Sequence, residues 1–408
     1  MKEDGLFVVV GGSKSQVPFI QAAKDMGFKT VVFDRDQAAP GTALADVFYP
    51  ISTHDTIGIL DRCRQMTREQ PLAGIITSSA YTLPLKAVAQ AAEMLGTKSF
   101  SVNTVELVND KSRMKGLFCC AGIPTPKWAK ATSDQAATSF FRQCGSPIII
   151  KPASGTMGSA GVSLVTIEAE ISPALADATK ASRDGTALLE EFCPGREFSI
   201  GGIVADGKVN ILALLEKHNL GRQHHFTISG FDMGPHKADG GFEKKVEAIL
   251  RVARQTVTIL EINNSFFTVD LLLTDGGPLV LEAGVLLDAK VDRLLAFSGI
   301  AVYDMICRVA TGQSVKFPEP SFKRGYAIKF IFSDRAGKLR FCKRQEGTAS
   351  ANRYIIEWWR EEGDYIQPPV SIADTLGWVM VEAEDAGFAY ETASKIASQE
   401  HFEIEDDQ

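Results

Sequence analysis

A lysine at the end of an apolar run is followed by a loop of small residues, and together they could hold a polyphosphate. The apolar run covers residues 147–150 and ends at Lys151, and residues 153–161 are mostly glycine, serine and alanine. Glycine permits close approach of the backbone, successive N–H groups form an anion nest, and the lysine adds a point charge. The loop is not a Walker A motif, because no Gly-Lys-Ser/Thr follows its glycines. A hairpin with a surface lysine is the alternative that this segment leaves open.

Two carboxylates lie in neighbouring apolar runs that predict a β-hairpin. Asp270 belongs to the run 266–273 and Glu282 to the run 279–283, and residues 275–278 have the composition of a turn. Facing carboxylates lose solvation and repel each other, so they need a cation or a shared proton. A magnesium ion that bridges them to substrate phosphates meets this need, because Mg²⁺ typically takes one or two carboxylates plus phosphates. The alternative is that both carboxylates face solvent.

A further acidic group follows the apolar residues 187–189. Glu190 and Glu191 end this run, and Glu197 comes shortly after it. Such carboxylates are costly if they are buried without partners. At the rim of a cleft they could accept hydrogen bonds from an adenine amine or from ribose hydroxyls, whereas a solvated turn is the alternative.

Histidines gather between residues 216 and 245, but their spacing matches no common zinc pattern. A loop that faces the substrate and a plain surface loop both remain open for this segment. Its basic and imidazole side chains are Lys217, His218, Arg222, His224, His225 and His236.

The N-terminal residues predict an α/β unit that could position such a site. Residues 6–10 and 30–34 read as buried strands, and residues 17–26 between them read as a helix that Gly27 is placed to end. This βαβ pattern implies a parallel sheet with a right-handed crossover. A further strand is expected at residues 74–78, with a helix over residues 83–95 after it.

Gly11 and Gly12 after the first strand, and Asp34 after the second, invite a dinucleotide-binding interpretation. The third glycine of G-x-G-x-x-G is missing, however. We therefore favour an α/β domain whose loops at the carboxyl ends of the strands line part of a substrate cleft, and keep a dinucleotide-dependent oxidoreductase as the weaker alternative.

Composition narrows the class of protein. The chain has 408 residues, 45% hydrophobic and 23% charged, with a net charge of −7, so it lacks the basic excess that favours a nucleic-acid binder. No apolar run approaches the roughly 18 residues that cross a bilayer. The seven cysteines include no Cys-x-x-Cys, which favours reduced thiols. The polar start shows no signal peptide, so we expect a cytoplasmic protein.

The C-terminal residues predict a mixed α+β unit. A strand is expected at residues 326–332, residues 339–341 are expected to pair back onto it, and another strand is expected at residues 377–383. Residues 388–399 read as a closing helix with apolar residues on one side.

In this order, the segments resemble the ATP-grasp superfamily over nearly the whole chain. Within it the chain is most similar to the carboxylate–amine ligases related to L-amino-acid ligases, biotin carboxylase and the purine-pathway carboxylases. Each motif is weak alone, and the resemblance rests on their order and spacing. The matching motifs are Gly11-Gly12 with Asp34, Asp110-Lys111, Ile150-Lys151-Pro152 with its loop, Glu190-Glu191 with Glu197, and the pair Asp270 and Glu282.

The resemblance implies an α/β fold, α+β in the ATP-grasp part, with four parts. Residues 1–110 would form a pre-ATP-grasp domain around a parallel sheet. Residues 111–200 would form the ATP-grasp lid with linker helices, and residues 201–312 the large lobe with the metal-binding hairpin. Residues 313–408 would form a small C-terminal subdomain of the biotin carboxylase type.

The resemblance also implies ATP and Mg²⁺ as cofactors and assigns residues to them. Lys111 and Lys151 would hold the phosphates, Asp270 and Glu282 would bind magnesium, and Glu197 would bind the ribose hydroxyls. The remaining nucleotide contacts would come from a lid over the phosphates with Ser154, Gly155, Gly158, Ser159 and Gly161, from Glu190 beside adenine, and from the backbone of Glu191, Phe192 and Cys193 at the edge of the base.

The chain departs from the family pattern after the second metal carboxylate. Relatives usually carry an Asn two residues on and an Arg two further, where this chain has Gly284 and Leu286. The Asn normally completes the metal shell, and the Arg normally steadies the acyl phosphate. Asp288, Lys290 and Arg293 are the nearby candidates to substitute, and we assign the catalytic role to Lys290 and Arg293.

The implied activity is that of an ADP-forming ligase. It would activate a small carboxylate as an acyl phosphate and join it to an amine or a similar nucleophile, with a homodimer expected by analogy. Because the Asn and the Arg are missing, a nucleotide-binding regulatory or scaffold protein with a degenerate ATP-grasp site is the alternative.

Overall fold

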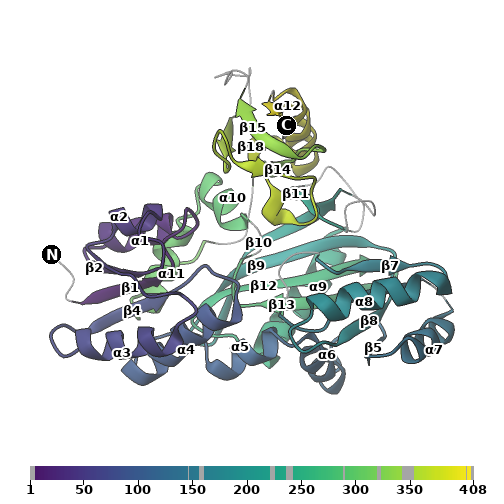
Figure 1. Cartoon of the computed structure of the whole chain (residues 1–408), viewed down its shortest axis with the longest axis horizontal. Coiled ribbons are helices and arrows are strands. Elements are labelled where there is room, and N and C mark those ends of the chain that lie inside the picture. Colours follow the sequence, from purple (N-terminus) through teal and green to yellow (C-terminus); the bar gives the residue numbers. More distant parts are fainter. Residues whose placement is uncertain are drawn as a thin grey trace.

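The structure is a computed structural model. It describes residues 5–145, 147–155, 160–220, 226–235, 242–287, 290–318, 323–341, 353–400 and 402–405. Among these residues no helix is both long enough and apolar enough to cross a membrane. The predicted α/β class is confirmed, with a parallel sheet at the N-terminus and antiparallel sheets after it (Figure 1).

A four-stranded parallel sheet forms the N-terminal region, in the order β3-β2-β1-β4. The predicted β1–α1–β2 unit is present, and α1 ends as expected, because Gly27 adopts φ 92° and its amide donates to the Lys24 carbonyl. The strands are β1 (Leu6–Val10), β2 (Lys29–Phe33), β3 (Val47–Tyr49) and β4 (Leu72–Ile76). The helices are α1 (Val17–Asp25), α2 (Pro40–Leu44), α3 (Thr56–Met66), α4 (Thr82–Leu95), α5 (Val102–Val108) and α6 (Lys111–Cys120).

A small antiparallel sheet follows, in the order β5-β8-β6-β7, with α7 and α8 packed against it. β6 and β7 pair in a hairpin around the glycine-rich loop. The elements are β5 (Trp128–Ala131), α7 (Asp134–Cys144), β6 (Ile148–Pro152), β7 (Ser163–Val165), α8 (Ile171–Ala181) and β8 (Ala187–Glu191).

An eight-stranded sheet runs through the rest of the chain, in the order β13-β12-β9-β10-β11-β14-β18-β16. Its strands are β9 (Arg196–Ala205), β10 (Lys208–Asn219), β11 (Ile228–Met233), β12 (Ser265–Thr274), β13 (Gly277–Gly284), β14 (Gly325–Ile331), β16 (Tyr354–Trp358) and β18 (Gly377–Ala383). The helices are α9 (Phe242–Ile259), α10 (Val291–Phe297), α11 (Val302–Ala310) and α12 (Ala386–Gln399). β12 and β13 form the predicted hairpin.

The C-terminal strands differ from the sequence prediction in their pairing. The prediction that residues 339–341 pair back onto residues 326–332 is wrong, because both edges of β14 are already taken by β11 and β18. The later strand instead joins a separate three-stranded sheet, in the order β17-β15-β19. Its members are β15 (Gly337–Phe341), β17 (Tyr365–Ile366) and β19 (Phe402–Glu405).

The hydrophobic cores explain how the sheets are joined. Two clusters contain residues of both the N-terminal sheet and the large sheet, such as Val8 with Phe267 in one and Val9 with Phe266 in the other. The small sheet has a core of its own, made by residues such as Ile150, Leu175 and Leu189. The small sheet is therefore a separate lobe, and the cavity described next lies between it and the large sheet.

Candidate active site

A cavity of about 630 Å³ opens between the small sheet and the large sheet. Its apolar wall includes Ile149 of β6, Leu272 of β12 and Leu281 of β13. Many of the residues predicted to form the site contribute to its lining, namely Lys111, Lys151, Glu190, Glu191, Phe192, Cys193, Glu197, Asp270 and Glu282. An apolar wall with a few convergent charged groups is typical of a small-molecule site.

Lys151 at the end of β6 is buried rather than exposed, so the surface-lysine alternative is wrong. Its Nζ lies 2.6 Å from Glu190 Oε2, and the other oxygen of Glu190 lies 2.6 Å from Lys115 Nζ. Burial works against the charged form of Glu190, but the two lysines dominate and lower its pKa. Burial opposes the charged form of Lys151, whereas Glu190 favours it. The pKa of Lys151 is raised as a result. Glu190 is buried in β8, which also excludes a solvated turn at this position.

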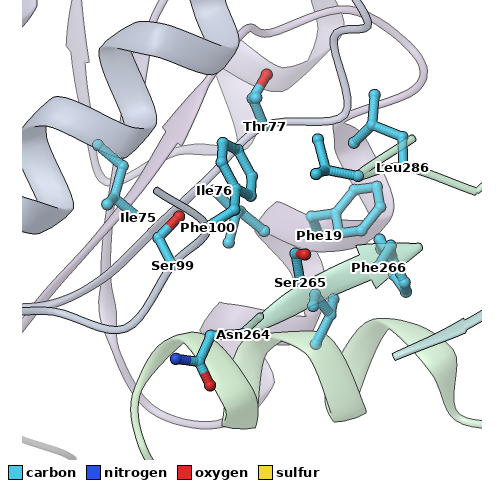
Figure 2. A pocket seen from close by; sticks show the side chains of 12 residues that line it. Phe19, Ile75, Ile76, Thr77, Ser99, Phe100, Asn264, Ser265, Phe266 and Leu286 are labelled. Atoms are coloured by element: carbon cyan, nitrogen blue, oxygen red, sulfur yellow. The ribbon is translucent and has the colours of Figure 1, made fainter. Parts of the chain in front are cut away.

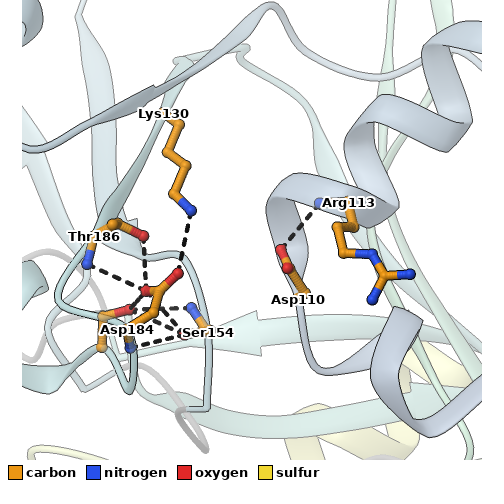
Figure 3. Close-up of polar contacts among 7 residues, drawn as sticks. Asp110, Arg113, Lys130, Ser154, Asp184 and Thr186 are labelled. Carbon is orange, nitrogen blue, oxygen red and sulfur yellow. Dashed lines mark hydrogen bonds and ion pairs between the residues drawn. The ribbon is translucent and has the colours of Figure 1, made fainter.

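Lys111 reaches the cavity from the first turn of α6. Asp110 caps this helix by accepting a hydrogen bond from the Arg113 amide, as Figure 3 shows. The Lys111 amide donates to the Ala153 carbonyl, which ties the helix start to the end of β6. Lys111 Nζ lies 3.1 Å from Glu282 Oε2, and its charge lowers the pKa of Glu282 to about 2.

Asp270 faces Glu282 across the hairpin, because the two residues are register partners on β12 and β13. Asp270 is buried, so the alternative that both carboxylates face solvent is wrong. Its Oδ2 lies 2.5 Å from Lys217 Nζ, and Lys217 also lies 3.3 Å from Glu197 Oε1. The Asn219 side-chain amide donates to the second oxygen of Glu197 at 3.1 Å. Two facing carboxylates beside lysines suit a magnesium ion shared with phosphates.

Asp184 holds the start of the glycine-rich loop (Figure 3). Its Oδ1 accepts hydrogen bonds from the hydroxyls of Ser154, Ser182 and Thr186, and its Oδ2 accepts from Lys130 Nζ at 3.1 Å. Burial opposes these donors, which nonetheless lower the pKa of Asp184 well below its usual range. The Ser154 hydroxyl is thus bonded to Asp184 and does not line the cavity.

The other loop residues are only partly described. Gly155 and Gly161 adopt φ values of +75° and +73°, which other residues rarely adopt, whereas Gly158 and Ser159 lie outside the described residues. Asp288 also lies outside the described residues. So do four residues of the histidine-rich segment, namely Arg222, His224, His225 and His236.

Backbone hydrogen bonds fix the segment of Glu191, Phe192 and Cys193, which we expect at the edge of the base. The Phe192 amide donates to the Pro147 carbonyl, and the Glu191 amide donates to the Lys127 carbonyl. Both bonds join the end of β8 to neighbouring segments. Burial raises the pKa of Cys193, so its thiol stays protonated at neutral pH.

The departure at Leu286 has a structural explanation. A second, much smaller cavity of about 20 Å³ lies where the N-terminal region meets the large sheet, and Leu286 lines it together with Phe19 and Phe266 (Figure 2). This space holds about one water molecule, so it is no ligand site. Leu286 therefore belongs to an apolar region together with Phe19 and Phe266. Gly284 leaves room, because a Cβ there would meet no atom within 4 Å.

The structure does not bring Lys290 and Arg293 to the cavity lining. Lys290 Nζ lies 3.5 Å from the centroid of the Trp359 ring and 5.1 Å from that of Trp378. Burial lowers the pKa of Lys290 to about 8. Arg293 donates to the Lys14 carbonyl at 3.3 Å, so both cations contact other parts of the chain.

Asp34 stabilises the loop that follows β1. It accepts hydrogen bonds from the amides of Gly12, at 2.8 Å, and Asp36, at 3.0 Å. Both oxygens of the carboxylate that suggested ribose binding are therefore used to fix the loop after β1.

Two lysines of the site were not predicted as site residues. Lys115 is one helical turn after Lys111, and this i, i+4 spacing is the signal that could have placed both on one face of α6. In the sequence Lys217 is part of the basic segment only, and its contact with Asp270 joins residues that are distant in sequence.

Comparisons with known proteins agree with this architecture. The family model described as the phosphoribosylglycinamide synthetase ATP-grasp (A) domain matches residues 109–285. The model of the ATP-grasp N-terminal domain matches residues 20–97.

Solved structures of similar fold cover nearly the whole chain. L-amino acid ligase from Bacillus licheniformis matches with a TM-score of 0.79 and 20% identity over 100% of both chains. The biotin carboxylase domain of 2-oxoglutarate carboxylase from Hydrogenobacter thermophilus, crystallised with MgADP, ADP and bicarbonate, matches with a TM-score of 0.77 and 16% identity over 98% of this chain and 91% of that one. Phosphoribosylglycinamide synthetase from Anaerococcus prevotii matches with a TM-score of 0.72 and 17% identity over 99% of this chain and 100% of that one. At these identities the likeness is one of fold.

Proposed function

The chain belongs to the ATP-grasp superfamily, and from this premise we propose that it is an ATP-dependent ligase that joins a carboxylate to an amine or a similar nucleophile. The observation that carries the proposal is the charge arrangement of the large cavity. Lys151 reaches it from β6 of the small sheet and Lys111 from the first turn of α6, and the carboxylates Asp270 and Glu282 face each other on the large sheet. Cations for phosphates and a carboxylate pair for magnesium thus meet in one space.

In the first step, an oxygen of the substrate carboxylate attacks the γ-phosphorus of ATP. The bond from this phosphorus to the β–γ bridging oxygen breaks, ADP leaves, and an acyl phosphate forms. Lys111 and Lys151 offset the charge of the transferring phosphoryl group, so catalysis is mainly positioning and charge neutralisation. Their present partners, Glu282 and Glu190, keep both ammonium groups at the cavity before a nucleotide arrives.

In the second step, the amine nitrogen attacks the acyl carbon. The nitrogen loses a proton and inorganic phosphate leaves, which yields an amide. Enclosing the acyl phosphate between the two lobes would limit its hydrolysis by water. A small-molecule acid and amine, a homodimer and a cytoplasmic location are parts of the same proposal.

Magnesium fits the residues that the structure provides. Asp270 and Glu282 supply hard oxygen ligands from adjacent strands, and magnesium bound there would neutralise phosphate charge. Lys217 and Lys111, which now contact these carboxylates, would have to shift toward phosphates or Glu197 as the ion enters.

The adenine would lie against the apolar wall made by Ile149, Leu272 and Leu281. The segment of Glu191, Phe192 and Cys193 would border the base, and Glu197 would accept hydrogen bonds from the ribose. Support for this placement comes from their common position on the cavity lining.

The test is ADP release with ATP and magnesium against pooled carboxylic acids, with and without pooled amino acids. Release that needs both an acid and an amine is the expected result. Release with an acid alone would mean activation without amide formation. Protein that binds no nucleotide would overturn the proposal.

A second candidate is a nucleotide-binding regulatory or scaffold protein. Gly284 and Leu286, which replace the family's Asn and Arg, favour it, as does the position of Lys290 and Arg293 away from the cavity lining. It predicts nucleotide binding with no substrate-dependent ADP release across the same panel.

A further inference from the structure

Lys115 is a fully buried lysine behind the nucleotide cavity. Its side chain is 0% exposed, and its Nζ lies among three oxygen atoms. These are Glu190 Oε1 at 2.6 Å, Thr125 Oγ1 at 2.6 Å and the Val280 carbonyl oxygen at 3.1 Å. It therefore joins α6 to β8 of the small sheet and to β13 of the large sheet.

The contacts of this lysine favour its charged form, whereas its burial opposes it. Burial lowers the pKa of Lys115 in spite of Glu190. However, the Thr125 hydroxyl donates its own proton to the Val280 carbonyl, so Thr125 can only accept from Lys115. Lys115 donates hydrogen bonds to Thr125 and Val280, which takes two N–H groups. A neutral amine would then turn its lone pair toward the Glu190 carboxylate 2.6 Å away, whereas an ammonium presents positive charge to it.

Lys115 differs from the other lysines of the site in its access to the cavity. Lys111, Lys151 and Lys217 line the cavity, and Lys115 does not. Each of the cavity carboxylates Glu190, Glu197, Asp270 and Glu282 has a lysine within reach, and Glu190 lies between two lysines, Lys115 and Lys151.

The shared carboxylate creates a problem for phosphate binding. Glu190 is 3% exposed, and a buried carboxylate that loses its cation is costly. If Lys151 were its sole cation, turning Lys151 toward a phosphate would leave Glu190 unpaired. With Lys115 in place, Glu190 keeps a partner whichever way Lys151 turns.

We propose that Lys115 is a positioning residue that holds Glu190 permanently and so frees Lys151 to bind the phosphates of a nucleotide. The inference rests on one part of the proposed function, namely that the protein binds a nucleotide. Lys115 then affects how tightly the phosphates of the ligand are bound, but not how tightly its base is bound.

The test compares ADP and adenosine, because only ADP has phosphates. Binding of both is measured by titration calorimetry without magnesium, so that the lysines are the cations that meet the phosphates. Lys115→Met keeps an unbranched side chain but removes the charge. We expect its ADP affinity to fall about tenfold or more, the usual cost of a lost charged contact, with adenosine affinity unchanged.

A double variant guards against a purely structural effect. Lys115→Met combined with Glu190→Gln removes both charges, so Lys151 is no longer held by a carboxylate. We expect the ratio of ADP to adenosine affinity to return toward that of the wild type, and circular dichroism reports whether each variant folds.

The outcomes separate this inference from the proposed function. Wild-type protein that binds neither ligand overturns the proposed function and this inference with it. If the wild type binds both ligands, the inference alone fails when Lys115→Met weakens them equally or leaves ADP binding unchanged. It also fails when the double variant keeps the low ratio of the single one.

Discussion

Asp270 on β12 and Glu282 on β13 stand directly opposite each other, yet each carboxylate has its own lysine. Lys217 contacts Asp270 from β10, and Lys111 contacts Glu282 from α6. The two carboxylates therefore need no shared proton, because two cations from different elements offset their repulsion. A divalent ion that enters this site must compete with lysines that are already in place.

Glu282→Gln tests whether this pair binds magnesium. The substitution keeps the shape of the side chain but removes the charge, so we expect the magnesium concentration for half-maximal ADP release to rise about tenfold or more. Glu391→Gln, at an exposed position of α12, is the matched control and should leave the metal response unchanged. A magnesium requirement equal to that of the wild type would remove Glu282 from the site.

Lys151→Ala tests the phosphate-binding role of the lysine at the end of β6. Loss of one preorganised cation at the transferring phosphoryl group should slow ADP formation about a hundredfold. Glu190 keeps Lys115 as its partner, so the fold should persist. Lys180→Ala removes an exposed lysine of the same lobe and serves as the control. Wild-type turnover by Lys151→Ala would exclude the assignment.

The sequence predicts the elements that carry the site, because their signals are local. An apolar run before Lys151 predicts β6, and two apolar runs around a turn predict the hairpin of Asp270 and Glu282. Partners on distant elements give no such signal. Neither the contact of Lys217 with Asp270 nor that of Lys115 with Glu190 could be read from the chain.

The same limit explains the errors at the C-terminal side of the chain. The runs 326–332 and 339–341 are near neighbours in sequence, which favours a hairpin. β14 instead lies between β11 and β18, both distant in sequence. Lys290 follows the hairpin of Asp270 and Glu282 closely, but its side chain packs on Trp359. Contacts between residues that are distant in sequence determine both the pairing of β14 and the position of Lys290. The local sequence pattern does not predict such contacts.

The departure at Gly284 and Leu286 predicts different effects for two substitutions. Gly284→Asn has room for its Cβ, so we expect a normal fold and a severalfold lower magnesium requirement if the amide reaches the metal shell. Leu286→Arg places a charge beside Phe19 and Phe266 and should lower the free energy of unfolding by about 1–3 kcal/mol. Urea denaturation measures the stability of both variants, and ADP release at increasing magnesium concentrations measures the metal requirement of Gly284→Asn. A Leu286→Arg variant as stable as the wild type would show that this apolar contact contributes little.

Lys290 should make the stability of the protein depend on pH in a defined range. Its pKa falls from 10.5 to about 8 because the folded protein buries it, chiefly against Trp359 and Trp378. Between these values the unfolded chain holds more protons at this position than the folded one. The lysine's contribution to the free energy of unfolding must therefore rise as the pH increases from 8 to 10.5.

Lys290→Met isolates this effect from the other groups that titrate in the same range. Methionine keeps the apolar contact with the two indole rings but binds no proton, so the variant should lack this part of the rise. We expect the wild type to gain stability relative to Lys290→Met when urea denaturation is repeated at pH 7, 8, 9 and 10, values chosen to span roughly the titration range of the lysine. Lys316→Met, at an exposed lysine, should follow the wild type at every pH. A constant difference between wild type and Lys290→Met would mean that Lys290 titrates alike in the folded and unfolded chains, and that the indole rings hold it without favouring its neutral form.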